Sequence, residues 1–185
     1  MEDLRDRLVA VGLVVDHGYD TFHLPIGEAT ITLQDVEVLY GLPVDGHHVD
    51  YPHALREYTG LQYLQMLQWL ADFQPAEEAA LSGGSRLQLT PVRLHLEEMD
   101  ADITDDTLDL LIDLYTRLLM LLMFGGVLFS NTSGNLVNLR FLHHLERLDD
   151  LPSYSWGAAV LGYLYNRCPG KHGHSARRYQ ILPLL

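Results

Sequence analysis

Asp20-Thr-Phe-His-Leu-Pro-Ile-Gly-Glu-Ala-Thr-Ile-Thr-Leu-Gln-Asp-Val-Glu-Val-Leu-Tyr-Gly-Leu-Pro-Val-Asp-Gly46 is the stretch that decides the fold. Its first part alternates apolar residues with polar or turn residues, as half-buried strands do, at Phe22, Leu24 and Ile26 and again at Ile31 and Leu33. Gly27-Glu28 lies between the two runs. A Gly-X pair suits a two-residue turn, because glycine adopts a positive φ without a Cβ clash. The sequence therefore predicts a β-hairpin.

The second part of the stretch changes to helical spacing. From Leu33 to Tyr40 the apolar residues Val36, Leu39 and Tyr40 fall on one side. Gly41, followed by Pro43, provides a stop signal. We therefore expect a short helix that ends at Tyr40 and a loop that turns the chain.

With these features the segment resembles the plant mobile domain, also called the aminotransferase-like plant mobile domain, of MAINTENANCE OF MERISTEMS-like proteins and plant transposons. The stretches Leu122–Leu145 and Tyr154–Tyr165 resemble the second half of that family. The likeness covers roughly positions 10 to 167. It implies a nuclear protein-interaction domain that acts with a phosphatase-like protein in gene-expression maintenance, meristem maintenance and transposon silencing, or a transposon-derived relative.

Length and composition favour one globular domain. The chain has 185 residues, of which 48% are hydrophobic and 20% charged, enough to bury a sizeable core. The longest charge-free apolar run, Leu118–Phe129, has twelve residues, fewer than the roughly 18–20 that span a bilayer, and predicts a buried core helix. The acidic and basic start of the chain predicts no secretory signal. The single cysteine, Cys168, fits a reducing compartment.

The charge distribution divides the chain near residue 167. The net charge of −13 argues against broad binding to nucleic-acid phosphates, which depends on lysine and arginine. The last nineteen positions nevertheless hold four of the twelve Lys and Arg residues and no acidic residue. We expect a helical domain over 1–167 and a basic tail over 168–185 that diverges from the family pattern. A domain without its final C-terminal helices would leave apolar surface open to a partner.

The rest of the domain is predicted to be a series of helices, which makes the chain mainly α, a multi-helix globular domain with an N-terminal β-hairpin. One amphipathic helix is expected between about Ala54 and Phe73. Further helices are expected over Ala76–Leu81, from Thr90-Pro91 toward Met99, over about Thr104–Phe124, from Ser133 or Asn135 along the leucines 136, 139, 142, 145 and 148, and over about Ser155–Arg167. A loop is expected from Gly125 to Gly134.

The acidic and histidine-rich segments do not match a metal site. Asp100–Asp113 holds six aspartates, but an EF-hand loop that starts at Asp100 would need glycine at its sixth position, where the chain has Asp105. These acids instead suit the N-terminus of a helix. Cys168, His172 and His174 form the best local zinc cluster, but no second ligand pair precedes them. We expect neither metal nor cofactor.

Enzymatic motifs are not recognisable. No G-x-S-x-G or phosphate-binding G-x-x-x-x-G-K-[ST] pattern occurs. Aminotransferase chemistry would need a lysine for pyridoxal phosphate within a large fold, and the sole lysine, Lys171, lies in the glycine-rich tail. The metallophosphatase signatures G-D-x-H-G and G-N-H-E are also missing. We expect no aminotransferase or phosphatase activity.

Aromatic and histidine residues are the candidates for an interaction surface. We select Tyr51, His53, Trp156, Tyr163 and Tyr165, because aromatics anchor interfaces as well as cores. The expected partner is a phosphatase-like protein, with DNA or chromatin contacted indirectly and no membrane or small-molecule substrate. A DNA-binding module is the alternative function, and an enzyme of unknown type is the third.

Overall fold

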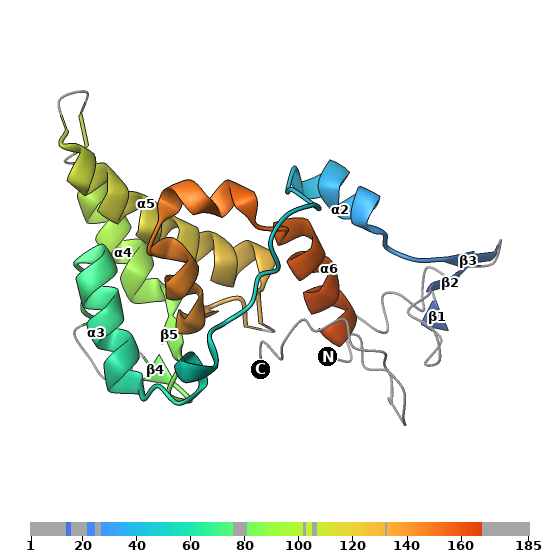
Figure 1. The fold of residues 1–185 in the computed structure, drawn as a ribbon, viewed down its shortest axis with the longest axis horizontal. Coiled ribbons are helices and arrows are strands. Elements are labelled where there is room, and N and C mark those ends of the chain that lie inside the picture. The colour runs from blue at the N-terminus through green and yellow to red at the C-terminus, as the bar shows by residue number, and fades with distance from the viewer. Residues whose placement is uncertain are drawn as a thin grey trace. The chain divides into compact units, whose positions relative to one another are not determined.

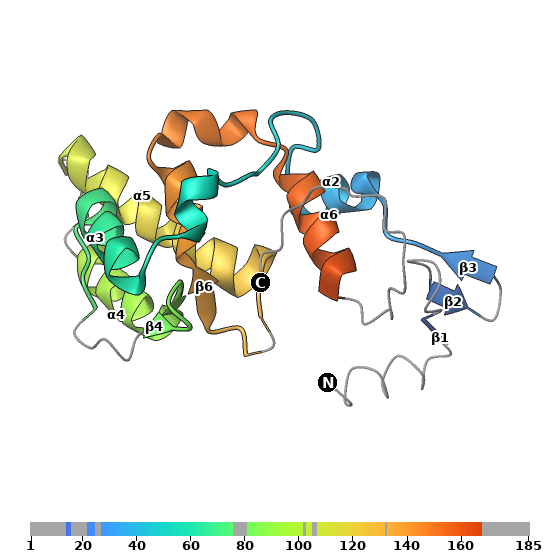
Figure 2. The same cartoon turned by 60° about the horizontal axis from the view of Figure 1, so that its bottom comes forward.

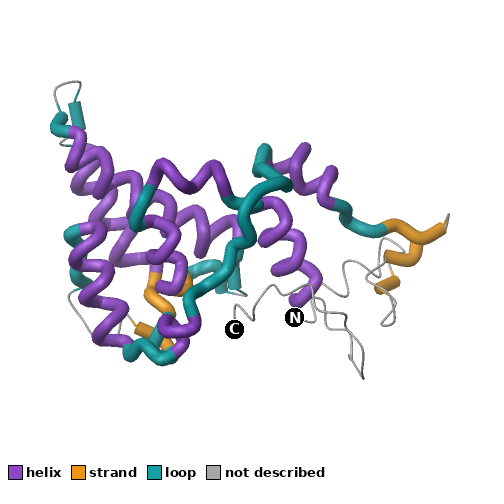
Figure 3. Tube along the Cα trace, viewed as in Figure 1, coloured by secondary structure: helices purple, strands orange, loops and turns teal. Residues whose placement is uncertain are grey.

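The computed structural model describes residues 14–15, 22–24, 27–75, 81–101, 103–104, 107–131 and 133–167. The chain divides into two compact units: unit 1 combines residues 1–50 with 152–185, and unit 2 comprises residues 51–151. Helices make up most of the described chain, and the strands are short (Figures 1 and 3). The prediction of a mainly α chain with an N-terminal β-hairpin is confirmed.

The hairpin of unit 1 belongs to a three-stranded antiparallel sheet with strand order β1-β2-β3. Its strands are β1 (Val14–Val15), β2 (Phe22–Leu24) and β3 (Gly27–Ala29). Leu24 pairs with Gly27, and Gly27-Glu28 lies in β3 rather than in the predicted turn. Ile26 lies outside the described residues. Ile31 and Leu33 are not in a strand, because Thr32 caps the following helix instead.

Helix α2 (Leu33–Tyr40) has the predicted bounds because both of its ends are encoded locally. The Asp35 N–H donates to Thr32 Oγ1 (3.3 Å), and the Thr32 N–H donates to Asp35 Oδ2 (2.8 Å), which completes a capping box. Gly41 ends the helix in the left-handed region with φ 65°. The predicted apolar side is only partly correct: Val36 is buried, whereas Leu39 and Tyr40 are exposed.

Helix α6 (Trp156–Arg167) packs beside α2 (Figures 1 and 2). This contact brings the N-terminal and C-terminal segments of unit 1 together. The His47 N–H donates to the Ser153 carbonyl (2.8 Å), and the Ser155 N–H donates to the His47 carbonyl (2.8 Å). The Gly157 N–H donates to the Pro43 carbonyl (2.8 Å). The loop after α2 is thus fixed by backbone hydrogen bonds to the start of α6, whose predicted position is confirmed.

Unit 2 begins with a short 3₁₀ helix, η1 (His53–Arg56), and then α3 (Gly60–Ala71). The prediction of one continuous helix from about Ala54 is wrong, because Thr59 forms a second capping box with Gln62 and starts a new helix. The predicted apolar face is largely correct: Tyr63, Leu67 and Leu70 are buried. Most of the predicted helix Ala76–Leu81 lies outside the described residues, and Leu81 starts a strand.

A second three-stranded antiparallel sheet joins distant parts of unit 2 in the order β4-β5-β6. Its strands are β4 (Leu81–Ser82), β5 (Arg86–Gln88) and β6 (Leu136–Asn138). Helix α4 (Leu89–Asp100) follows β5 directly, one residue before the predicted start at Thr90. Asn135, a predicted helix cap, instead accepts from the Leu89 N–H (3.0 Å) through its carbonyl oxygen.

Helix α5 (Asp109–Met123) packs against α3 and α4 and continues as a π-helix, η3 (Phe124–Leu128). Figure 2 shows α3, α4 and α5 side by side. The predicted helix is present, but it starts at Asp109 rather than Thr104. The expectation that it is a buried core helix is only partly correct: Leu118 and Leu121 are buried, whereas Leu119 and Met123 are exposed. The loop expected at Gly125 is wrong: a Cβ there would lie 2.6 Å from Val137 Cβ, so glycine lets the π-helix approach β6.

The leucines at 136, 139, 142, 145 and 148 do not form the predicted α-helix, and only the middle three are buried. Leu136 is in β6, η4 (Leu139–Leu145) is a 3₁₀ helix, and a further 3₁₀ helix, η5 (Leu148–Ser153), follows. A 3₁₀ helix has three residues per turn, so side chains three apart lie above one another. Leu139, Leu142 and Leu145 therefore share one face, and all three are fully buried.

The capping box of α2 makes unit 1 sensitive to acid. Hydrogen bonds from the Thr32 backbone N–H and then its hydroxyl lower the pKa of Asp35 below the ordinary value of 3.8. Because the folded-state pKa is the lower one, this stabilisation is present above pH 3.8 and is lost as the pH falls through the folded-state pKa. We expect the urea midpoint of unit 1 to fall in this range more for the wild type than for Asp35→Asn, whose side chain does not titrate. Equal pH dependence of the two proteins would contradict this role of the box.

Candidate interaction surface

The five predicted interaction residues differ in their accessibility. Tyr51, Trp156 and Tyr163 are buried within their units, and His53 is exposed on η1. Tyr165 is half-buried, and its hydroxyl contacts the Ile31 carbonyl and the Thr30 hydroxyl. Tyr51 contributes to the core through its ring, 5.9 Å from that of Phe141. Their role in binding stays a prediction, but the buried three are not available at the surface of their units.

Large exposed apolar side chains gather elsewhere. In unit 1 they occupy the end of α2, at Val38, Leu39 and Tyr40. In unit 2 they occur singly on α3 and α4, as with Trp69 and Leu94, and as a row on α5. Single exposed apolar residues are ordinary, whereas a contiguous row indicates a binding surface.

The row on α5 is the most extended of these surfaces. Leu108, Ile112, Leu119, Met123 and Val127, here called the α5 stripe, are between 40% and 76% exposed. Successive members are four or seven residues apart, which places Ile112, Leu119 and Met123 along one side of α5. Leu108 is the residue directly before α5, and Val127 lies in η3. Leu118, Leu121 and Phe124 on the opposite side are buried. The helix thus buries one apolar face and leaves a second one open.

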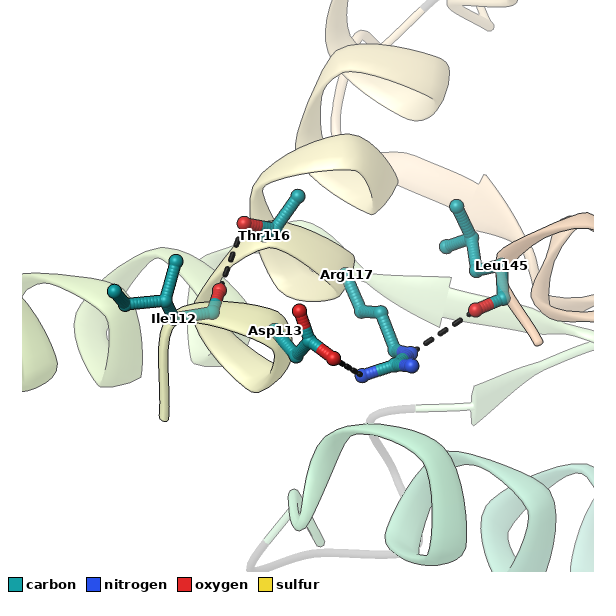
Figure 4. A network of polar contacts seen from close by, with 5 residues as sticks. All are labelled: Ile112, Asp113, Thr116, Arg117 and Leu145. Atoms are coloured by element: carbon teal, nitrogen blue, oxygen red, sulfur yellow. Dashed lines mark hydrogen bonds and ion pairs between the residues drawn. The ribbon is translucent and has the colours of Figure 1, made fainter. Parts of the chain in front are cut away.

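Two polar residues of α5 have hydrogen-bond partners inside the protein. The hydroxyl of Thr116, which interrupts the stripe, donates to the Ile112 carbonyl of the same helix (2.7 Å). Arg117 Nε donates to the Leu145 carbonyl (3.0 Å), and its guanidinium lies 3.9 Å from Asp113 Oδ2 (Figure 4). The Arg117 side chain is only 14% exposed. The stripe therefore presents little competing positive charge.

Carboxylates flank the N-terminal half of the stripe on both sides. Asp109 and Asp113 lie on one flank of α5 and are exposed. On the other flank the Tyr115 hydroxyl donates to Asp100 Oδ1 of α4 (3.3 Å). Burial, and then the negative charge of Asp100, raise the pKa of Tyr115. From Leu118 to Phe129 the chain has no charged residue, so the stripe is acidic at one end and neutral at the other.

This surface was not predicted from the sequence, although its signal was visible. The run toward Phe124 is apolar nearly all round, which we interpreted as a fully buried helix. Among the described residues, one helix, Asp109–Leu128, is long and apolar enough to cross a membrane by length and composition. Of the most apolar 18-residue segment of this helix, only 22% is buried inside the protein. A core helix of a soluble protein also meets this criterion, so the observation is weak evidence for a membrane, but it confirms that much apolar surface is open.

Metal-binding groups do not converge in the described part of the chain. No three His, Cys, Asp or Glu side chains there lie close enough to hold a metal ion. The predicted zinc candidates Cys168, His172 and His174 lie outside the described residues. The acidic segment Asp100–Asp113 is described only in part. Among the described residues, the α5 stripe is the candidate functional site, because it is the most extended exposed apolar surface.

Comparison with known proteins places these observations in a family. The model of the family described as Plant mobile domain matches residues 18–179, which extends into the tail predicted to diverge. The chain is 32% identical to Protein MAIN-LIKE 2 of Arabidopsis thaliana over 79% of its length and 20% of that protein. It is 34% identical to a Serine/threonine-protein phosphatase 7 long form homolog of the same plant, over 78% of this chain and 10% of that protein.

A third relative is Protein MAINTENANCE OF MERISTEMS of Arabidopsis thaliana, 29% identical over 88% of this chain and 31% of that protein. The chain thus spans between 10% and 31% of the length of these three curated relatives. No solved structure matches the chain.

Proposed function

This chain belongs to the plant mobile domain family, and from that premise we propose that it is a nuclear protein-interaction domain with no catalytic activity of its own. Its proposed partner is a phosphatase-like protein. With that partner it serves gene-expression maintenance, including meristem maintenance, and transposon silencing, or it is a transposon-derived relative that keeps the same binding surface.

The α5 stripe is the observation that carries this proposal. An apolar row along a whole helix loses free energy in water, at about 25 cal/mol for each Å² that stays unburied. Soluble monomers rarely expose such contiguous apolar surface unless it is a binding site. The carboxylates beside it keep the surface soluble while no partner is bound.

The names of the relatives support the choice of partner. One of them is named as a phosphatase 7 long form homolog, and the region that matches this chain makes up 10% of it. A segment that small can be an accessory module of a longer chain. In that relative the matching region and the rest of the protein belong to one chain. For this chain we propose that a phosphatase-like protein is bound as a separate partner.

Direct DNA binding is the alternative function. A DNA-binding surface needs clustered Lys and Arg, whereas this chain carries a net charge of −13 and Arg117 on α5 points inward. The four basic residues near the C-terminus favour the alternative, but they are few. An enzyme ranks third.

The test is capture of partners from a nuclear extract of Arabidopsis thaliana by the tagged chain, after nuclease treatment, at low and high salt. We expect phosphatase-fold proteins, identified by mass spectrometry, to remain bound in both salts, because apolar burial is insensitive to salt. Direct DNA binding through the four C-terminal basic residues would instead weaken by about 10²-fold between 50 and 200 mM salt. Loss of every specific protein after nuclease, together with salt-sensitive binding to a labelled DNA duplex, would overturn the proposal.

A further inference from the structure

We propose that the α5 stripe binds an amphipathic helix of the partner protein, one with apolar residues at three- and four-residue spacing and with Lys or Arg gathered at one end. This inference rests on the proposed interaction function and specifies its surface and the chemistry of the partner.

The shape of the stripe fits a helical partner. Four of its five side chains lie on the continuous helix of 20 residues Asp109–Leu128, and Leu108 directly precedes it. At about 1.5 Å per residue, such a helix measures roughly 30 Å. A partner helix places its own apolar side chains at the same spacing, so two helices can pack along several turns. A flat or globular partner would match such a narrow stripe less well.

The charge around the stripe determines the partner's chemistry. The N-terminal half of the stripe is flanked by Asp109 and Asp113 on one side and by Asp100 on the other. Asp113 Oδ2 lies 3.9 Å from Nη1 of the largely buried Arg117, so Asp109 is the carboxylate on its flank with no basic group beside it among the described residues. The C-terminal half has no charged residue on α5 or η3. Helix α3, which also packs on α5, has no charged residue, and the exposed Arg93 of α4 lies two turns before Asp100. A complementary helix is therefore basic beside Ile112 and neutral beside Val127.

Lipid and a second copy of the chain fit this charge pattern less well. Helices that lie on membranes carry Lys and Arg beside their apolar face, and anionic headgroups would repel the carboxylates found here. In a parallel pair of α5 helices the acidic ends would face each other. In an antiparallel pair each acidic end would face the neutral end of the other copy. Neither occupant supplies the positive charge that the acidic end can bind.

The first experiment repeats the capture with a double variant, Leu119→Ser with Met123→Ser. Both side chains are 40% exposed, so the fold should persist, which circular dichroism verifies. We expect phosphatase-fold protein to be retained at least about tenfold less than by the wild type, because central apolar contacts dominate interfaces. The control is Leu39→Ser on α2, which removes a side chain that is 76% exposed and should leave retention unchanged. If the double variant does not fold, Ile112→Ser with Val127→Ser takes its place.

The outcomes separate the two proposals. If neither the wild type nor the control retains a specific protein after nuclease, the proposed function fails. If the double variant retains the same proteins as the wild type, the function stands and the α5 stripe is the wrong surface. If only the double variant loses them, both are supported.

The second experiment tests the partner's chemistry with a displayed library of helical peptides of about 18 residues, selected on the wild type and depleted on the double variant. We expect the selected peptides to converge on apolar residues at three- and four-residue spacing and on Lys or Arg at one end. Asp109→Asn with Asp113→Asn should weaken a selected basic peptide by about two- to fivefold at low salt, because exposed ion pairs contribute little each.

Other results would overturn the inference. These are peptides without a basic end, binding to vesicles of anionic phospholipid that the double variant loses, or dimers in sedimentation that dissociate in the double variant.

Discussion

Replacing Phe141 with alanine should lower the free energy of unfolding of unit 2 by about 3–5 kcal/mol. Phe141 is 1% exposed, and its ring centroid lies 4.7 Å from that of Phe129 and 4.9 Å from that of Phe124. Alanine removes the ring that links η3, η4 and Tyr51, and the surrounding rings can fill the cavity only in part. Urea unfolding followed by circular dichroism measures the change.

Two further variants control this measurement. Phe141→Leu keeps most of the buried volume and should cost less than alanine. Leu94→Ala removes a side chain that is 56% exposed and should change the free energy of unfolding by less than about 0.5 kcal/mol. An effect of Phe141→Ala as small as that of Leu94→Ala would show that this ring cluster does not hold unit 2 together.

Replacing Gly46 with alanine should destabilise unit 1 for two independent reasons. Gly46 has φ 128°, and an alanine there carries backbone strain of about 1–3 kcal/mol. Its Cβ would also lie 2.4 Å from the Ser153 carbonyl oxygen, so the backbone must move, at a further cost of about 1–3 kcal/mol. That movement would break the bond from the His47 N–H to the same carbonyl.

Gly41→Ala is the matched control for Gly46→Ala. Gly41 has φ 65°, but a Cβ there would meet no atom within 4 Å. Only the backbone strain of about 1–2 kcal/mol applies, so its effect should be clearly smaller. The fluorescence of Trp156, which is 5% exposed, reports unit 1 once Trp69 is replaced by phenylalanine. Equal destabilisation by the two variants would mean that the loop does not need close approach to Ser153.

Sequence reasoning succeeded where the determinants of structure are local. Helix α2 was predicted with its bounds because Thr32, Asp35 and Gly41 encode its ends within ten residues. The buried face of α3 was predicted from apolar spacing, and α6 was predicted to within one residue of its observed start. The hairpin was recognised, but Gly27 was assigned to its turn, whereas Gly27 pairs with Leu24 and lies in β3.

The secondary-structure predictions were wrong where contacts with distant parts of the chain determine the local structure. Leu136–Asn138 become a strand because β5 offers a pairing partner about fifty residues earlier in the chain. Gly125 continues a helix instead of ending it because Val137 approaches it closely. The leucines at every third position fit a 3₁₀ helix better than an α-helix, and that period was available in the sequence.

The candidate surface was not predicted from the sequence. Open apolar surface was expected only as a result of missing C-terminal helices, and the sequence could not show which apolar faces pack inside. Tyr51 and Trp156 were reasonable candidates for an interface and are buried, whereas the α5 residues were assigned to the core and form the open stripe. Because both faces of α5 are apolar, only the packing of α3 and α4 distinguishes them.

The bonds between the loop after α2 and the start of α6 have a consequence for biosynthesis. Ser155, whose hydroxyl donates to the Val44 carbonyl, is made 111 residues after it. At about 5–20 residues per second, the ribosome needs on the order of 6–20 s to supply the missing segment. During that time all of unit 2 is synthesised, and the nascent α2 has no packing partner. Chaperones that hold emerging chains therefore have a defined interval in which to act on this protein, and slower translation of residues 51–151 would lengthen it.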